Sequence, residues 1–517
     1  MSEFVILDFG SQSTHLIRRR LQDLGFMAEV IPSSSTLDEV AAKKPAGIIF
    51  SGSPNSVYDD QAQKLSADIL KLDVPKLGIC YGFQRMVQDS GGCVEPCAVR
   101  EFGECAVSLV AEDPLFRDIE KEFTTWMSHG DSITALPDDC TLIASTDNHP
   151  AAAYMGKYRF WGVQFHPELS HCNHGIDILR NFARVICAQQ PSLKSLAETF
   201  EHIKEDIRMR AQNRPVLLLI SGGVDSSVAA AALLKSLSED QVHLLYLDTG
   251  LMRRNETKEI ESILRSLAAK HVHIVHAREE YLQALANMAD PEEKRKIIGD
   301  LFVKITQREV EKLGLGDDFL LAQGTLYTDL IESGKGTGKH AHVIKSHHNV
   351  NSPLITQKRE QGRLIEPLRD LYKDQARALG KYLGLPDSII YRHPFPGPGL
   401  GIRVLGAVDK EKIDILQRAD AIYLDELTKR DLYDKIWQAF TVLIPVKSVG
   451  VAGDVRKYGY TVALRAVKSV DGMSAEAFDF NMRDIKEIAA RITNEVAEVS
   501  RVVYDISSKP PATVEWE

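Results

Sequence analysis

Seven consecutive residues near the middle of the chain have the composition of a phosphate-binding loop. They read SGGVDSS and stand between an apolar run at residues 215–220 and a helix-forming run at residues 228–237. Glycines let the backbone turn tightly around an anion, and the first turn of a helix offers unpaired N–H groups. The pattern therefore predicts a phosphate site. Its residues are Ser221, Gly222, Gly223, Val224, Asp225, Ser226 and Ser227.

This loop lacks the lysine with which kinase and ATPase loops hold the β- and γ-phosphates, which points away from γ-phosphate transfer. Ser226 and Ser227 offer hydroxyl groups, and Asp225 offers a carboxylate for a metal ion. Lys373 could hold pyrophosphate in place of the missing lysine, although its spacing alone favours a solvated side chain at a helix start. The alternative for the whole loop is an ordinary Gly-Gly turn before a capped helix. The match of all seven residues favours the functional interpretation.

A cysteine at position 80 stands in the pattern of a nucleophile elbow. An apolar run at residues 76–79 enters the sequence GICYG, and a helix-forming run follows. Glycines relieve crowding at a sharp turn from strand to helix, and the helix N-terminus favours the thiolate of Cys80. His166 follows another apolar run, with Glu168 two residues later. Cys80, His166 and Glu168 therefore form a candidate triad, whereas Cys80 alone would be explained as a buried core thiol.

The two candidate sites need separate layers of strands and helices to position them. Apolar runs alternate with helix-forming segments from residue 4 to about residue 190, and a second alternation begins at residues 215–220. We expect an α/β protein with two doubly wound domains, mainly parallel sheets and a small C-terminal α+β domain. This last domain is too small to bury both faces of its sheet, which favours pairing with a second chain. The expected domains are residues 1–190, 191–390 and 391–517.

Length and composition limit the classes of protein. The chain has 517 residues, of which 44% are hydrophobic and 26% charged, so it is globular and too long for a single core. We expect a cytoplasmic protein without a membrane partner, because no apolar stretch is long enough to span a bilayer and no leader is recognisable. A formal net charge of −10 argues against a nucleic-acid partner.

Two of these motifs resemble known families. SGGVDSS resembles the PP-loop of ATP pyrophosphatases, which hold pyrophosphate while the α-phosphorus of ATP is attacked. GICYG together with VQFHPE resembles the class I glutamine amidotransferases. That resemblance implies that Cys80 attacks the side-chain amide of glutamine, that His166 transfers the proton and that Glu168 orients His166. It also implies oxyanion N–H groups at Gly52 and Tyr81.

Further motifs extend the resemblance over essentially the whole chain, to the family of glutamine-hydrolysing GMP synthases. It implies that ATP, with Mg²⁺, adenylylates xanthosine monophosphate (XMP), and that ammonia from glutamine displaces AMP to give GMP. It also implies XMP contacts at Arg295, Lys509 and Glu515, and a homodimer formed through the C-terminal domain. The motifs are EEKRKIIGD, SHHNV, RHPFPGPGL and SRVVYDISSKPPATVEWE.

Other readings compete with this interpretation. Another PP-loop amide ligase, such as a glutamine-dependent NAD synthetase, usually carries a nitrilase-type glutaminase, so GICYG with VQFHPE disfavours it. A regulatory protein with inactive sites is expected to have lost Cys80, His166 or Asp225, and all three are present. One departure is that Asn351 and Ser352 stand where the resembled family usually has two glycines.

Overall fold

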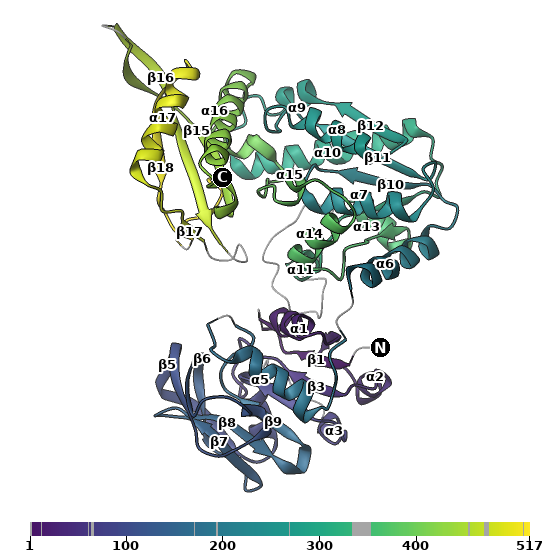
Figure 1. Cartoon of the computed structure of the whole chain (residues 1–517), viewed down its shortest axis with the longest axis vertical. Helices are drawn as coiled ribbons and strands as arrows, with labels where there is room; N and C mark the ends of the chain where they lie inside the picture. Colours follow the sequence, from purple (N-terminus) through teal and green to yellow (C-terminus); the bar gives the residue numbers. More distant parts are fainter. Residues whose placement is uncertain are drawn as a thin grey trace. The chain divides into compact units, whose positions relative to one another are not determined.

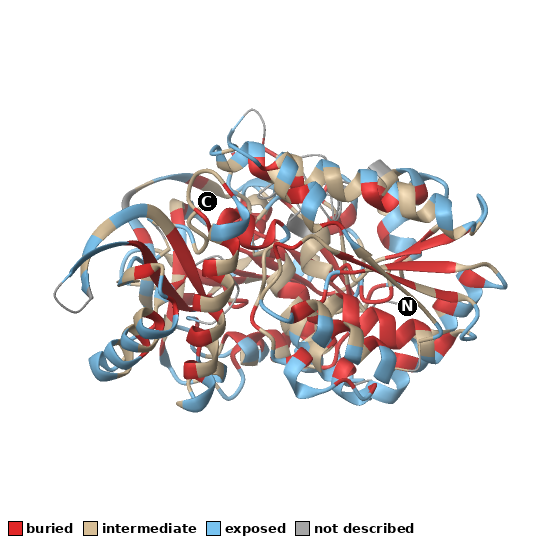
Figure 2. Cartoon of the chain, turned by 90° about the horizontal axis from the view of Figure 1, so that it is seen from above, coloured by how far each residue is buried: buried red, intermediate tan, exposed pale blue. Residues whose placement is uncertain are grey.

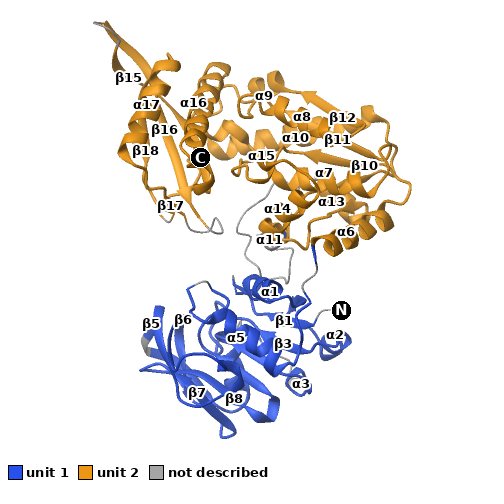
Figure 3. Ribbon diagram, in the orientation of Figure 1, with its two compact units in different colours: residues 1–195, 330–345 blue, residues 196–329, 346–517 orange. Residues whose placement is uncertain are grey.

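The chain folds into two compact units, which are described separately. Figure 3 shows them as residues 1–195 with 330–345, and residues 196–329 with 346–517. The motif SHHNV, Asn351 and Ser352 fall outside the described residues. The computed structural model describes residues 3–11, 13–59, 62–63, 67–169, 171–192, 195–267, 269–332, 353–452, 455–469, 475–509 and 511–517.

The first unit is built on one nine-stranded sheet (Figure 1). Its first five strands are parallel, and the rest of the sheet is antiparallel. The sequence predicted the parallel part but not the antiparallel extension. In sheet order the strands are β2 (Ala28–Pro32), β1 (Phe4–Asp8), β3 (Gly47–Phe50), β4 (Lys76–Ile79), β9 (Phe160–Val163), β8 (Pro150–Met155), β7 (Cys140–Ser145), β5 (Cys93–Leu109) and β6 (Glu122–Ala135).

Helices cover both faces of the parallel part, which explains why its central strands are mostly apolar. Along β1, Phe4 and Ile6 join one core and Val5 and Leu7 join the other, because successive side chains point to opposite faces. The first core includes α1 (Thr14–Asp23) and α5 (Gly175–Asn181), and the second includes α2 (Leu37–Ala42), α3 (Ala67–Leu70) and α4 (Tyr81–Asp89).

The second unit contains a five-stranded parallel sheet. The chain leaves β10 outward to β11 and β12 and then returns to β13 on the other side of β10. Ligands of such sheets bind where the strand order reverses, which here is between the carboxyl ends of β10 and β13. In sheet order the strands are β12 (His271–His276), β11 (Val242–Asp248), β10 (Val216–Ile220), β13 (Leu320–Ala322) and β14 (Leu364–Ile365).

Helices flank this parallel sheet, as the alternation in the sequence predicted (Figure 1). The helix that precedes β10 begins at Leu196. The flanking helices are α6 (Leu196–Ala211), α7 (Val224–Ser236), α8 (Glu256–Ser266), α9 (Arg278–Ala284), α10 (Pro291–Leu313), α11 (Tyr327–Glu332), α13 (Pro353–Glu360), α14 (Lys373–Tyr382) and α15 (Asp387–Ile390).

The C-terminal part of this unit has a small second sheet. Strands β15 and β16 are antiparallel, and β18 pairs in parallel with β16. One hydrophobic core joins α16 and α17 to this sheet and continues to Leu247 of β11 and Ile298 of α10. The expected boundary near residue 390 stays a prediction. The elements are α16 (Lys410–Lys429), β15 (Gln438–Ala452), β16 (Val455–Lys468), β17 (Glu476–Ala477), α17 (Met482–Glu495) and β18 (Val499–Asp505).

The far end of the β15–β16 hairpin is exposed although it is rich in apolar side chains. Figure 2 shows exposed residues along this hairpin, in contrast to the buried strands of the parallel sheet. Val451 is 78% exposed and Val446 is 67% exposed. Within the part of the chain that the structure describes, no helix is long and apolar enough to cross a membrane.

Candidate functional site

The nucleophile elbow lies at the carboxyl end of β4. Cys80 has a φ of 52°, a conformation that non-glycine residues adopt at strained functional turns. A Cβ added at Gly78 would lie 2.4 Å from Phe160 Cζ, and one at Gly82 would lie 2.5 Å from the carbonyl oxygen of Phe50. Both glycines of GICYG are therefore needed for the helix that follows to pack against the sheet.

His166 and Glu168 follow β9, the neighbour of β4 in the sheet. His166 Nδ1 lies 2.8 Å from Glu168 Oε1, and Ser13 Oγ donates to the same oxygen at 2.6 Å. Burial alone would lower the pKa of His166, but the carboxylate of Glu168 and the sulfur of Cys80 outweigh burial and raise it well above its ordinary value. The site therefore favours a protonated imidazole at His166, beside the sulfur of Cys80.

A third loop, after β3, completes this site. The buried Ser51 hydroxyl donates to Gly52 O at 3.0 Å and accepts from the Phe9 N–H at 2.9 Å, so it fixes the loop. A Cβ added at Gly52 would lie 3.3 Å from His166 Cε1. Tyr81 is the first residue of α4, so its N–H belongs to the helix turn that has no intrahelical partner. Strands β3, β4 and β9 are adjacent and bring the five predicted residues together.

The SGGVDSS loop joins β10 to α7, as predicted, with Gly223 at the N-cap and Val224 as the first helical residue. Ser226 Oγ donates to Gly223 O at 3.1 Å, and Ser227 Oγ donates to the same oxygen at 2.9 Å. Ser221 Oγ lies 3.1 Å from Ser226 Oγ. The hydroxyl groups thus lie together at the helix N-terminus, where an anion is favoured.

Lys373, at the start of α14, forms an ion pair with Asp225 Oδ2. The loop has no lysine of its own, and Lys373, 148 residues after Asp225 in the sequence, takes that position beside it. Asp225 Oδ1 is buried and has no hydrogen-bond partner among the described residues. In those same residues no group of three or more His, Cys, Asp or Glu side chains could hold a metal ion. Asp225 therefore fits Mg²⁺ only as one ligand beside phosphate oxygens, which is the usual way proteins bind Mg²⁺.

Arg392 holds the loop from the other side, and its role was not predicted. Its Nη1 donates to Gly222 O at 3.0 Å and lies 3.1 Å from Glu256 Oε1, while its Nη2 pairs with Glu259 at 3.0 Å. Arg392 is the first residue of the motif RHPFPGPGL, and the motif alone did not show what the arginine contacts. Gly324 lies against the same loop, because a Cβ there would approach the backbone of Asp225 to 2.8 Å.

Two of the predicted XMP residues, Lys509 and Glu515, belong to the C-terminal segment at residues 506–517, and the third, Arg295, contacts its last residue. Arg295 Nη2 donates to Glu517 O. Glu515 accepts two hydrogen bonds from Arg403, at 3.0 and 2.8 Å, and Arg403 is fully buried. The backbone of Lys509 pairs with Ala475. Arg403 was not predicted, because nothing in its local sequence indicates a partner 112 residues away.

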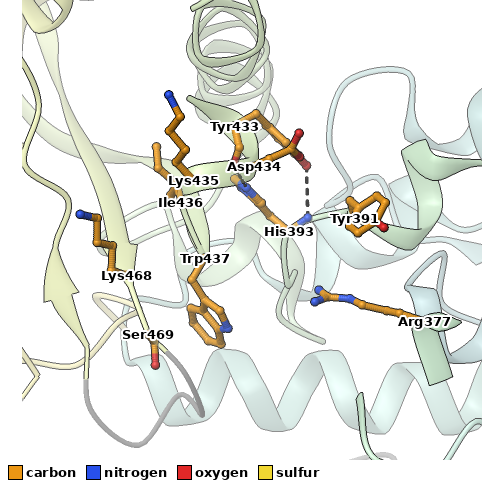
Figure 4. Close-up of a pocket in the computed structure, with 10 residues that line it drawn as sticks. All are labelled: Arg377, Tyr391, His393, Tyr433, Asp434, Lys435, Ile436, Trp437, Lys468 and Ser469. Carbon is orange, nitrogen blue, oxygen red and sulfur yellow. Dashed lines mark hydrogen bonds between the residues drawn. The ribbon is translucent and has the colours of Figure 1, made fainter. Parts of the chain in front are cut away.

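Figure 4 shows a pocket of about 470 Å³ in the second unit. Arg377 lies one helical turn after Lys373 on α14, and its side chain extends toward Trp437. Arg377 Nε is buried without a hydrogen-bond partner among the described residues. The pocket combines aromatic rings with cationic groups, and none of the predicted site residues lines it. Its lining is Arg377, Tyr391, His393, Tyr433, Asp434, Lys435, Ile436, Trp437, Lys468 and Ser469.

Comparisons with known proteins cover both units. The class-I glutamine amidotransferase model matches residues 5–186, the asparagine synthase model matches residues 201–299, and the GMP synthase C-terminal domain model matches residues 425–516. A GMP synthase (glutamine-hydrolysing) of Thermosipho africanus is 47% identical over 522 residues, which is 100% of both chains. The enzyme of that name from a Synechococcus species is also 47% identical, over 99% of this chain and 96% of the relative.

Among solved structures, a GMP synthase subunit protein from Thermoplasma acidophilum is 32% identical. It matches 36% of this chain and 94% of its own, with a TM-score of 0.33.

Proposed function

Because the chain belongs to the family of glutamine-hydrolysing GMP synthases, we propose roles in GMP synthesis for the residues of each site. The chain is a ligase that makes GMP in a glutamine-dependent reaction. Unit 1 releases ammonia from glutamine, and unit 2 activates XMP with ATP. The observation that carries this division is the convergence of Cys80, His166 and Gly52 from three adjacent strands of unit 1, while the SGGVDSS loop lies in unit 2.

In unit 1 the thiolate of Cys80 attacks the amide carbon of glutamine. The carbon–nitrogen bond breaks, and His166 gives its proton to the departing ammonia. Water then attacks the thioester, His166 takes a proton from it, and glutamate leaves while the thiolate returns. Glu168 holds the imidazole in orientation, and the N–H groups of Gly52 and Tyr81 stabilise the oxyanion of each tetrahedral intermediate.

In unit 2 the 2-oxygen of XMP attacks the α-phosphorus of ATP, and the bond to the β-phosphate breaks. The loop N–H groups, Ser226, Ser227 and Lys373 hold the departing pyrophosphate. Mg²⁺, when bound beside Asp225, supplies positive charge against the phosphate oxygens. Ammonia then attacks carbon 2 of the adenylylated XMP, and AMP leaves with the oxygen.

Arg295, Lys509 and Glu515 are the proposed XMP contacts. The hydrogen bond from Arg295 to the carbonyl oxygen of Glu517, two residues after Glu515, supports this assignment. Arg403 orients Glu515 through a bidentate pair, so the carboxylate is positioned before XMP arrives. A homodimer through the C-terminal domain is supported by the exposed apolar hairpin of β15 and β16. The cytoplasmic location stays a prediction.

Omission of single substrates tests the proposed chemistry. Pyrophosphate and GMP are measured with ATP, Mg²⁺, XMP and glutamine, and then with each omitted in turn. We expect pyrophosphate only when XMP is present, and GMP with either glutamine or ammonium as the nitrogen source. Pyrophosphate formation with deamido-NAD in place of XMP would instead support the alternative, an NAD synthetase.

A further inference from the structure

Gln164 is a buried amide that lies beside the nucleophile and that the triad does not use. It lies one residue after β9 and two residues before His166, and it is 1% exposed. Its Nε2 lies 3.6 Å from Cys80 Sγ. It is part of the motif VQFHPE, in which the histidine and the glutamate have predicted roles and the glutamine has none.

A chain of hydrogen bonds fixes the orientation of this amide. Gln84, on α4, donates from Nε2 to the backbone carbonyl of Asp131 at 2.9 Å. A carbonyl oxygen only accepts, so the nitrogen of Gln84 must face it. The same nitrogen lies 3.1 Å from Gln164 Oε1, which must therefore be the acceptor. The NH₂ group of Gln164 is then the end that faces Cys80 Sγ.

We propose that Gln164 is a positioning residue that donates an N–H to the Cys80 sulfur and favours its thiolate form. The inference rests on the proposed role of Cys80 as the glutaminase nucleophile. A hydrogen bond to the charged form of a group favours that form, and the site excludes the water that would otherwise solvate the sulfur. The N–H group of Gln164 acts together with the protonated imidazole of His166, which also hydrogen-bonds the sulfur of Cys80.

The size of the effect follows from the strength of one buried bond to a charged acceptor. Sulfur is a weak acceptor, so the effect lies at the lower end of the range for bonds to charged groups. Loss of the donor should therefore slow alkylation of Cys80 about tenfold at any pH below that at which its labelling rate levels off.

The experiment compares Gln164→Met with a matched variant, Gln88→Met, in the full chain. Gln88 lies on the same helix as Gln84, is exposed and accepts from the Val94 N–H. Iodoacetamide labelling of Cys80 is followed by peptide mass spectrometry as a function of pH. Burial raises the pKa of Cys140 and Cys172 to about 11, so these thiols react slowly near neutral pH.

We expect the labelling profile of Gln164→Met to move upward by about one pH unit and that of Gln88→Met to match the unaltered chain. In Gln164→Met the glutaminase kcat should fall while the KM for glutamine changes little. Ammonia-dependent GMP synthesis, which unit 2 performs, should not change. An unshifted labelling profile in Gln164→Met would overturn the inference. Absence of any glutamine-protected labelling at Cys80 in the unaltered chain would overturn the proposed glutaminase role itself.

Gln164→Glu keeps the shape and the acceptor for Gln84, so it decides the question if Gln164→Met does not fold. It places a carboxylate oxygen where the N–H was, and like charges close together disfavour ionisation. The labelling profile of Cys80 should therefore move further upward in pH than in Gln164→Met. A labelling profile of Gln164→Glu that matches the unaltered chain would also overturn the inference.

Discussion

Replacing Arg392 by methionine would remove the three contacts by which this side chain joins the phosphate loop to α8. The guanidinium bonds the Gly222 carbonyl, pairs with the buried Glu256 and pairs with the exposed Glu259. Methionine keeps much of the side-chain volume but removes all five N–H donors. The variant leaves Glu256, whose side chain is only 3% exposed, as a buried carboxylate without its cation.

The free energy of unfolding should fall by about 5 kcal/mol at neutral pH. Removing one partner of a buried pair costs about 3–5 kcal/mol, whereas the pair with Glu259 contributes at most about 1 kcal/mol, because that carboxylate is exposed. The lost bond to Gly222 adds about 1 kcal/mol. Replacing Glu256 by glutamine in the same chain removes the stranded charge, so the double variant should recover most of the loss.

The loss of stability caused by Arg392→Met should depend on pH. Burial raises the pKa of Glu256, and the positive charge of Arg392 lowers it, so the pKa rises further when Arg392 is absent. An acid whose pKa is raised in the folded state destabilises the fold above that pKa, and the penalty disappears as the pH falls through it. The loss caused by Arg392→Met should therefore be smaller at acidic than at neutral pH.

Amide hydrogen exchange of peptides that cover β10 and α7 measures the local free energy of opening. Arg265→Met, which breaks an exposed helical pair with Glu261, is the matched control and should change this free energy by less than about 0.5 kcal/mol. The KM for ATP should rise in Arg392→Met, because the Gly222 carbonyl is no longer held, while glutaminase activity stays unchanged. A loss below about 1 kcal/mol, or no recovery on adding Glu256→Gln, would refute the reasoning.

Four further substitutions test the remaining assignments. Cys80→Ala should abolish GMP synthesis from glutamine and spare synthesis from ammonium, and loss of both would contradict separate sites. Asp225→Ala should lower pyrophosphate release with either nitrogen source by at least about tenfold, since one charged contact is worth about 1.5–3 kcal/mol; undiminished release would contradict its role. Gly82→Ala should destabilise unit 1 by about 1–3 kcal/mol in thermal unfolding, because the new Cβ would lie 2.5 Å from a carbonyl oxygen. Arg403→Met should raise the KM for XMP with little change in that for ATP, and equal changes in both would count against a role for Glu515 in binding XMP.

The sequence predicted those parts of the sites that depend on consecutive residues. A strand that runs into Gly-x-Cys-x-Gly leaves only a sharp turn into a helix, and the clash distances at Gly78 and Gly82 confirm that larger residues would not fit. The SGGVDSS loop joined β10 to α7 for the same reason. Such patterns are predictable because the strand, the turn and the helix follow one another without interruption, over residues 76–89 in one site and 216–236 in the other.

Contacts between distant residues were not predictable in this way. Ser13 bonds Glu168 because the loop after β1 lies near the loop after β9, and the order of strands in the sheet is not visible in either segment. The orientation of the Gln164 amide depends on Gln84 and on one backbone carbonyl of β6, and neither contact can be read from the sequence around Gln164. The antiparallel half of the first sheet was missed because strands such as β6 mix polar residues with apolar ones, whereas the parallel strands are short continuous apolar runs.

Charge pairs show why the energetically important contacts are the harder ones to predict. Arg265 and Glu261 are four residues apart on one helix, so their pairing can be predicted from spacing. Arg265 is exposed and Glu261 only partly buried, so water competes with the pair. Arg403 and Glu515 are 112 residues apart, and Arg403 is fully buried. Its charge is costly in the core unless the carboxylate is present, so the pair constrains the fold as well as the site. Both pairs join an arginine to a glutamate. They differ in their contribution to stability because Arg403 is buried, and that burial can be seen only in the tertiary structure.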